Sequence, residues 1–139
     1  MNESEDTQLQ ELVGLARAAA RQAYAPESGF RVGAAIRARS GAVYTGCNVE
    51  NASFSVSVCA ERVALFAAVA AGAREFTGLA VVAGEDGLDD APPCGACRQA
   101  LVEFSPGMMI AYRFGGEYVA RTLSELLPDP FTRKDGRRG

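Results

Sequence analysis

The sequence predicts an α/β domain in which helices cover both faces of a mixed, roughly five-stranded sheet, giving three layers. Predicted strands and helices alternate along the chain, which is typical of this class. The dipeptide Ser40-Gly41 predicts a tight turn between the first two strands, so this hairpin adds an antiparallel pair to the sheet. The 139 residues suit one domain, spanning 1–139, with enough chain to bury a core.

The first half of the chain is predicted to form a helix, a hairpin, a polar loop and a second helix. Apolar positions at helical spacing indicate the first helix, which Pro26 ends and which has Leu15 on its expected apolar face. Gly72 is expected to end the second, alanine-rich helix. The predicted ranges are 8–24 for the first helix, 30–38 and 42–46 for the strands, 48–57 for the loop and 59–71 for the second helix.

The second half is predicted to form a strand, an acidic connection, a helix, two more strands and a short final helix. Gly78 and Gly84 bound the strand, and Pro92-Pro93 introduce the helix. The two ends of the chain, about 1–7 and 133–139, are polar and charged and are expected to be flexible tails. The predicted ranges are 79–83, 84–93, 94–104, 108–114, 117–121 and 123–127, in that order.

The composition favours a globular protein of a reducing compartment over a membrane, secreted or nucleic-acid-binding protein. The longest apolar run, residues 63–73, is too short to span a bilayer, and residues 1–10 are too polar for a secretory signal. The four cysteines are therefore expected to be free thiols in the cytoplasm, with two disulfides as the alternative. Basic residues are scattered over a chain of net charge −3, apart from those in the tail, so neither a nucleic acid nor a membrane is an expected partner.

Three cysteines and one glutamate, Cys59, Glu61, Cys94 and Cys97, have the pattern of a catalytic zinc site. Zinc takes four tetrahedral ligands, and a catalytic site keeps one position for water, so three thiolates leave that position open. Glu61 lies two residues after the first thiol, close enough to move protons to and from the water without binding the metal. The chain contains no histidine, which excludes any scheme that needs an imidazole.

The predicted helices place the thiols where thiolates are favoured. Cys59 and Cys94 fall at helix starts, whose unpaired N–H groups lower the pKa of a thiol, and Cys97 lies one turn after Cys94. Three thiolates and Zn²⁺ sum to one negative charge, which weakens the Lewis acid, so a positive group is expected nearby. Arg62 is the main candidate, while Arg98 is the weaker one because it could pair with a surface carboxylate.

Two other interpretations of these residues stay open. Glu61 could serve only as an acidic partner of a helix dipole, as glutamates in first turns often do. Cys47 is expected to be a small buried residue at a strand end, but it could be a fourth thiolate of a closed, structural zinc site. That second alternative leaves Glu61 without a role.

Five short segments carry a resemblance to a known family. They are residues 30–35 (FRVGAA), 46–53 (GCNVENAS), 59–62 (CAER), 93–99 (PCGACRQ) and 126–128 (LLP). With these segments in this order, the chain resembles the small homotetrameric type of cytidine deaminase over nearly its whole length. The resemblance implies the cytidine-deaminase-like fold and one zinc ion per subunit, bound by Cys59, Cys94 and Cys97, with Glu61 as the proton shuttle.

The resemblance also implies roles for residues that the pattern alone leaves unexplained. Ala60 would accept a hydrogen bond from the exocyclic amine through its carbonyl oxygen. Phe54 stands where family members often carry tyrosine, and Val63 where threonine is frequent. The remaining implied roles are charge moderation around the thiolates by Arg62 and Gln99, ribose binding by Asn48 and Glu50, packing on the pyrimidine by Phe30, and aromatic contacts across subunits by Phe54 and Phe131.

The implied function is hydrolytic deamination of cytidine and deoxycytidine to uridine and deoxyuridine, with release of ammonia, in pyrimidine salvage. The implied partners are a small nucleoside substrate and three further copies of the chain, in a homotetramer with shared sites. One alternative is a deaminase of another aminopyrimidine nucleoside, such as a blasticidin-type antibiotic. The other is a non-catalytic zinc module. The segment Asn48-Val49-Glu50 favours cytidine over the first alternative, because the resemblance makes it a ribose-binding segment.

Overall fold

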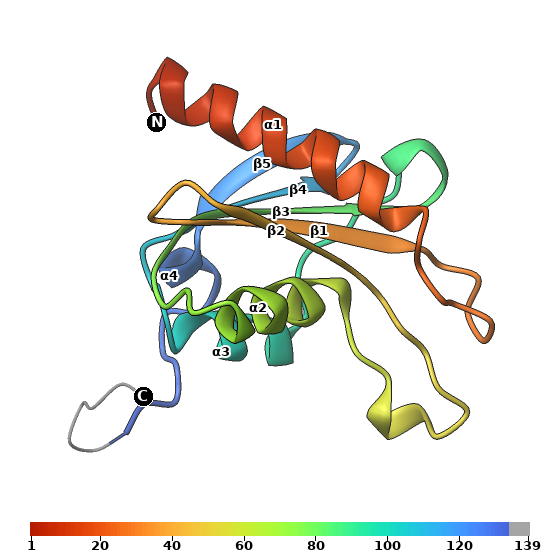
Figure 1. Cartoon of the computed structure of the whole chain (residues 1–139). Coiled ribbons are helices and arrows are strands. Elements are labelled where there is room, and N and C mark those ends of the chain that lie inside the picture. Colours follow the sequence, from red (N-terminus) through yellow and green to blue (C-terminus); the bar gives the residue numbers. More distant parts are fainter. Residues whose placement is uncertain (134–139) are drawn as a thin grey trace.

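The computed structural model describes residues 1–133 as a mixed five-stranded sheet between two layers of helices (Figure 1). The elements are α1 (Glu3–Ala20), β1 (Val32–Ala38), β2 (Val43–Cys47), the 3₁₀ turn η1 (Phe54–Val56), α2 (Ala60–Ala70), β3 (Phe76–Ala83), the 3₁₀ turn η2 (Glu85–Gly87), α3 (Gly95–Val102), β4 (Met109–Phe114), β5 (Glu117–Thr122) and α4 (Leu123–Leu126). The strand order is β2-β1-β3-β4-β5, and only the β3–β4 pair is parallel. The predicted fold class is thus confirmed.

The central strands are buried on both faces, so their sequence is apolar without alternation. In β3, Leu79 and Val81 pack in the cluster formed with α2 and α3, whereas Ala80 and Val82 pack in the cluster formed with α1. Figure 1 shows α1 lying across one face of the sheet and α2 and α3 across the other. The sheet therefore separates two cores, and the thiols belong to the side of α2 and α3.

Two glycines bring the helices against the sheet. At Gly33 in β1, an added Cβ would overlap the carbonyl oxygen of Ala16 in α1. At Gly46 in β2, it would overlap the backbone of Ala60 and Ala64 in α2. Because backbone atoms cannot give way as a flexible side chain does, each glycine fixes how closely its helix packs. Gly46 thereby sets the position of the helix turn that carries Glu61.

Gly33→Ala is expected to lower the free energy of unfolding by about 3 kcal/mol, because overpacking against backbone must push α1 off the sheet. Gly14→Ala is the control: Gly14 lies in α1, the helix that Gly33 contacts, and no atom lies within 4 Å of its added Cβ. It should stabilise the protein by about 0.5–1 kcal/mol through helix propensity. Thermal unfolding followed by circular dichroism measures both. Equal melting temperatures for Gly33→Ala and the unchanged chain would contradict this packing argument.

The first helix differs from its predicted range at both ends. It begins at Glu3, because Asn2 and Glu5 form a reciprocal capping box, with the Glu5 N–H donating to Asn2 Oδ1 at 2.8 Å. Residues 3–7, expected to lie in a flexible tail, therefore form its first turns. The helix ends at Ala20, four residues before the predicted end, and Leu15 is exposed rather than on the buried face. Of the other expected tail, only Arg133 lies within the described residues.

Most other helices and strands begin and end within two residues of their predicted positions. The main exception is β3. It begins at Phe76 rather than Leu79, because Gly78 is part of the strand, where its missing side chain accommodates Leu9 and Leu12 of α1. The loop after β2 contains the unpredicted turn η1. Within residues 1–133, none of the helices has the length and apolar character needed to cross a membrane.

Candidate active site

The three predicted metal ligands meet at the starts of two helices. Cys59 is the N-cap of α2, Cys94 is the N-cap of α3, and Cys97 lies in the first turn of α3. Their three Sγ atoms lie within 4.8 Å of one another, at 3.8 Å for Cys59–Cys94 and 3.4 Å for Cys94–Cys97. Tetrahedral thiolates about 2.3 Å from zinc are about 3.8 Å apart, so the cluster has the donor set and spacing that zinc requires.

Arg62 supplies positive charge beside the thiols. Its Nη2 donates to Cys59 Sγ at 3.6 Å. Hydrogen bonding from Cys97, assisted by Arg62 and Cys94, lowers the pKa of Cys59 to about 5 although burial opposes it. The same pairing with Cys59, together with burial, raises the pKa of Cys97, and the thiols in turn raise the pKa of Arg62. The neighbouring thiols and Arg62 therefore favour the thiolate form of Cys59.

Glu61 is buried in the first turn of α2, beside the thiol cluster but outside it. Burial is the main cause that raises the pKa of its carboxyl to about 7, and the charge of Cys59 raises it further. A carboxyl with a pKa near neutrality can both accept and donate a proton at physiological pH. A glutamate that only balanced a helix dipole would gain nothing from such burial, so the position suits acid–base chemistry.

Cys47 does not join the metal cluster. It is the last residue of β2 and pairs with Gly33 of β1. Among residues 1–133, the only group of three or more metal-binding side chains consists of Cys59, Cys94 and Cys97. The interpretation of Cys47 as a fourth thiolate, which would have closed the site, is therefore wrong for this structure, and all four cysteines are free thiols.

A cavity of about 390 Å³ opens beside the thiols and contains most of the predicted substrate residues. Cys59, Ala60 and Glu61 line it from the start of α2, and Cys94 from the start of α3. Phe30, Asn48, Glu50 and Phe54 line it from the segments before β1 and after β2. The structure thus brings together residues that lie up to 64 positions apart, from Phe30 to Cys94, around one cavity with both apolar and polar lining residues.

Asn48 and Glu50 already make hydrogen bonds within the protein. Asn48 accepts from the Val32 N–H at 2.9 Å and donates to the Phe30 carbonyl oxygen at 2.8 Å. Glu50 accepts from the N–H groups of Glu27 and Ser28 at 2.9 and 3.0 Å, and from the Ser28 hydroxyl at 2.5 Å. Both side chains therefore hold the segment that carries Phe30 against the loop after β2.

Three residues expected near the site contact other parts of the chain. The Gln99 amide forms two hydrogen bonds with the Phe131 backbone, at 2.9 and 3.1 Å, and makes no hydrogen bond to the thiols within residues 1–133. Phe131 itself is 83% exposed and does not line the cavity of its own chain. Arg98 donates to the carbonyl oxygens of Pro93 and Leu126, both at 2.8 Å, rather than to a surface carboxylate. It braces the start of α3 against α4.

Sequence reasoning missed Ser28 as a site residue. Ser28-Gly29 is a turn in the sequence and in the structure, and that local signal hides the contact with Glu50 across 22 positions. Ser57 and Val58 also line the cavity, and nothing in the spacing of the chain singles them out. The motif 46–53 is the only sequence signal that this part of the chain approaches the thiols.

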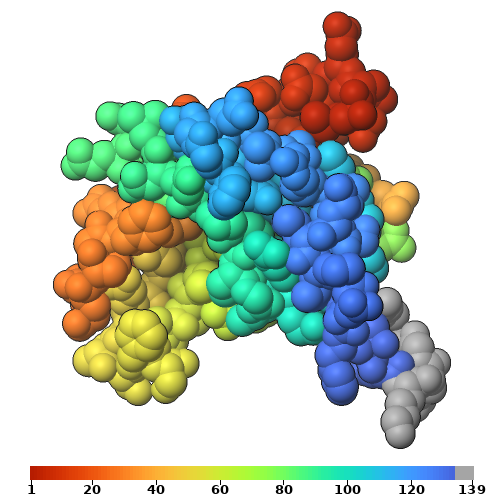
Figure 2. Space-filling view, turned by 180° about the vertical axis from the view of Figure 1, so that it is seen from behind, coloured from red at the N-terminus to blue at the C-terminus, as the bar shows by residue number. Residues whose placement is uncertain are grey.

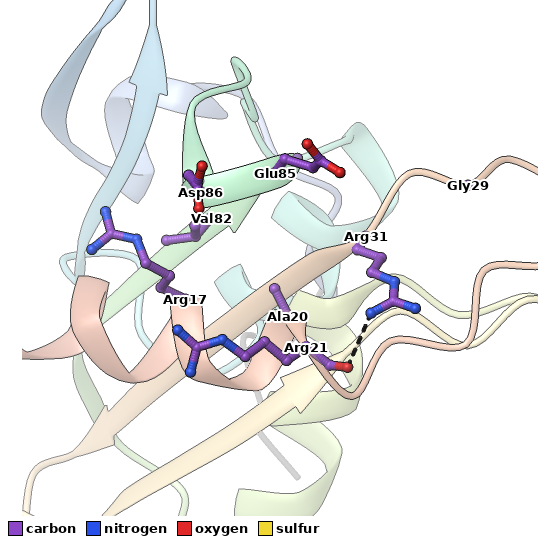
Figure 3. Close-up of a pocket in the computed structure, with 10 residues that line it drawn as sticks. Arg17, Ala20, Arg21, Gly29, Arg31, Val82, Glu85 and Asp86 are labelled. Atoms are coloured by element: carbon purple, nitrogen blue, oxygen red, sulfur yellow. Dashed lines mark hydrogen bonds between the residues drawn. The ribbon is translucent and has the colours of Figure 1, made fainter.

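A second cavity, of about 500 Å³, lies on the α1 side and has a different character (Figure 3). Arg17 and Arg21 from the end of α1 line it with Arg31, opposite the acidic Glu85 and Asp86. In Figure 3 the Arg31 guanidinium points to the Arg21 carbonyl oxygen, to which it donates at 3.3 Å. Basic side chains here complement the negative end of the helix dipole. The cavity contains no thiol of the cluster, so the site is assigned to the smaller cavity.

The comparison with protein families agrees with this geometry. Residues 6–112 match the family model described as the cytidine and deoxycytidylate deaminase zinc-binding region, which covers the thiols, Glu61 and the cavity. The chain belongs to this family of zinc-binding deaminases.

Comparison with individual proteins shows how similar the chain is to cytidine deaminases and to a deaminase of another substrate. The chain is 44% identical over 129 residues to the cytidine deaminase of Sporosarcina psychrophila, covering 91% of this chain and 93% of that protein. It is similar to the crystal structure of cytidine deaminase from Burkholderia pseudomallei, with a TM-score of 0.80, 41% identity and coverage of 94% and 100%. The blasticidin-S deaminase of Bacillus cereus is less similar, at 32% identity over 108 residues, or 73% of this chain and 77% of that protein. The higher identity to cytidine deaminases favours the interpretation as a cytidine deaminase over that as a deaminase of a blasticidin-type antibiotic.

Proposed function

We propose that the chain is a zinc-dependent cytidine deaminase, which hydrolyses cytidine and deoxycytidine to uridine and deoxyuridine and releases ammonia. The observation that carries the proposal is one cavity lined by two thiols of the metal cluster, Cys59 and Cys94, by the buried Glu61, and by the three predicted nucleoside contacts Phe30, Asn48 and Glu50. A structural zinc module has no use for a cavity of about 390 Å³ or for a buried carboxyl beside the metal.

The residues of this chain divide the reaction between them. Cys59, Cys94 and Cys97 would hold zinc, which would supply the Lewis acid needed to activate a water for attack on C4 of the pyrimidine. Glu61 would accept the first proton of that water and deliver it to N3, then accept the second proton from the new hydroxyl on C4 and deliver it to the departing amine. Its burial keeps bulk water from competing for these protons. The Ala60 carbonyl, at the first position of α2, is assigned the hydrogen bond from the exocyclic amine.

The Glu50 carboxylate, which lines the cavity, predicts a preference for nucleosides over nucleotides. Hydrogen bonds from Ser28 hold the pKa of the Glu50 carboxyl below its usual range. The group is therefore charged at neutral pH. A 5′-phosphate would approach this like charge. We expect the kcat/KM for cytidine monophosphate to be at least about tenfold below that for cytidine, since opposed like charges at a binding site cost several kcal/mol.

The decisive experiment follows the ultraviolet absorbance of cytidine mixed with the zinc-loaded protein. Loss of the cytidine band, with about one zinc per chain, supports the proposed function. No change at full zinc content would overturn the nucleoside assignment, and blasticidin-type substrates would then be compared in the same assay. Cytidine monophosphate turned over as fast as cytidine would contradict the role of the Glu50 charge.

A homotetramer with shared sites completes the proposal. Phe54 and Phe131 are 82% and 83% exposed, unusually large fractions for phenylalanine. Figure 2 shows the loop region that includes η1 (yellow) and the C-terminal segment (blue) projecting from the same side of the molecule, with the start of α3 (teal) between them. Neighbouring copies that cover these rings would bury apolar surface and enclose the substrate. The proposed setting is pyrimidine salvage in the cytoplasm, which would keep all four thiols reduced.

A further inference from the structure

We propose that Ser28 is a positioning residue, which orients the Glu50 carboxylate toward a ring hydroxyl of the substrate's sugar and so adds to the discrimination against nucleosides that lack both ring hydroxyls. The inference rests on the proposed function for the identity of the substrate. Its structural basis is the set of hydrogen bonds that joins residues 27–30, hereafter the strap, to Glu50.

The strap fixes both oxygens of the Glu50 carboxylate. Oε1 accepts two backbone N–H groups, from Glu27 at 2.9 Å and from Ser28 at 3.0 Å. Among residues 1–133, Oε2 accepts only the Ser28 hydroxyl, at 2.5 Å. A carboxylate oxygen can accept more than one hydrogen bond, so Oε2 keeps capacity for a substrate hydroxyl. Ser28 therefore determines which way the free acceptor of Glu50 faces.

The Ser28 hydroxyl is itself oriented. The Phe30 N–H donates to Ser28 Oγ at 2.9 Å, which leaves the hydroxyl hydrogen to point at Glu50. This relay connects the residue that packs on the base, Phe30, with the residue that reads the sugar, Glu50. Asn48 reinforces the connection from the other side, since it holds the carbonyl oxygen of Phe30. One rigid turn thus sets base and sugar contacts relative to each other.

The same hydrogen bonds favour the charged form of Glu50. The Ser28 hydroxyl is the largest cause of its lowered pKa, followed by the Ser28 N–H. Glu50 lies nine positions before the first metal ligand and outside the thiol cluster, so its ionisation is separate from that of the metal site. Loss of the hydroxyl should raise the pKa of Glu50.

The test compares Ser28→Ala with Ser28→Thr, which keeps a hydroxyl, and with Ser40→Ala as a matched control. Ser40 Oγ accepts from the N–H two residues ahead, at Ala42, as Ser28 Oγ does from Phe30, but it lies in the hairpin between β1 and β2. Two substrates are assayed with each variant: cytidine, and 2′,3′-dideoxycytidine, which lacks the ring hydroxyls. The Glu50 carboxyl is titrated by carbon NMR, with Glu50→Gln to identify its signal.

For Ser28→Ala we expect a loss of about tenfold in kcat/KM for cytidine, mainly through KM, because a hydrogen bond to a charged group is removed. The loss for dideoxycytidine should be less than about twofold, since neither ring hydroxyl remains to accept or donate a hydrogen bond at Glu50. Ser28→Thr should recover most of the loss, and Ser40→Ala should match the unchanged chain.

Two outcomes overturn the inference. Equal losses for both substrates would mean that Ser28 supports the strap as a whole and does not orient Glu50. An unchanged Glu50 pKa in Ser28→Ala would do so as well, and this result is independent of turnover. Failure of the unchanged chain to deaminate cytidine would instead reject the proposed function, which the NMR titration does not measure.

Discussion

Replacing Glu61 by glutamine is expected to abolish deamination while leaving the zinc bound. Glutamine has nearly the same shape, so the buried position stays filled, but it cannot accept the proton of the attacking water or return it to the substrate. The expected fall in kcat is on the order of 10² to 10⁴ or more, the usual contribution of a general acid–base group. Initial rates with cytidine and metal analysis of the same sample measure the two effects.

Glu117→Gln is the matched control for Glu61→Gln, because it removes an exposed carboxylate from β5, away from the cavity. Its rate should equal that of the unchanged chain. A near-normal rate for Glu61→Gln would refute the proton-shuttle role. Zinc lost from Glu61→Gln would show instead that the carboxyl helps to hold the metal.

Replacing Cys97 by serine is expected to remove the zinc. Cys97 is fully buried and belongs to the thiol cluster, and a serine hydroxyl, unlike a thiol, does not ionise at neutral pH to give an anionic ligand. Zinc affinity should fall by more than about 100-fold, beyond the upper range for residues that only touch a metal ligand. Competition with a chromogenic chelator measures the affinity, and activity should fall in parallel.

Cys47→Ser is the control for Cys97→Ser. It makes the same chemical change at the end of β2, in a residue outside the metal cluster. Zinc content and rate should be those of the unchanged chain. A Cys47→Ser variant that lost its zinc would revive the four-thiolate structural site and contradict the assignment of the open position.

The metal centre could be predicted because its determinants are local. Cys94 and Cys97 are one helical turn apart. The prolines before them predict the start of a helix, where a thiolate is favoured. The N-terminal start of α1 could also have been predicted. Asn2 and Glu5 have the spacing of a capping box, but the expected range followed apolar periodicity, which begins only at Leu9.

Contacts between segments far apart in the sequence could not be predicted from local sequence patterns. The bonds from Asn48 to Phe30 and Val32 span 18 and 16 positions, and that from Gln99 to Phe131 spans 32. Family resemblance indicated Asn48 as a ribose contact and Gln99 as a neighbour of the thiolates. In the structure each amide holds a backbone segment in place, a role that no rule of sequence spacing predicts.

The double engagement of Asn48 has a consequence for anyone who would redesign this protein for a new sugar. The Asn48 side chain is hydrogen-bonded to the backbone of Phe30 and Val32. Replacing Asn48 therefore alters the shape of the cavity wall along with its chemistry. Libraries that randomise this position would mostly return misshapen cavities rather than altered selectivity. Variation at the exposed Phe54, which lines the same cavity without a hydrogen-bonded side chain, leaves the framework intact and is the better starting point for engineering.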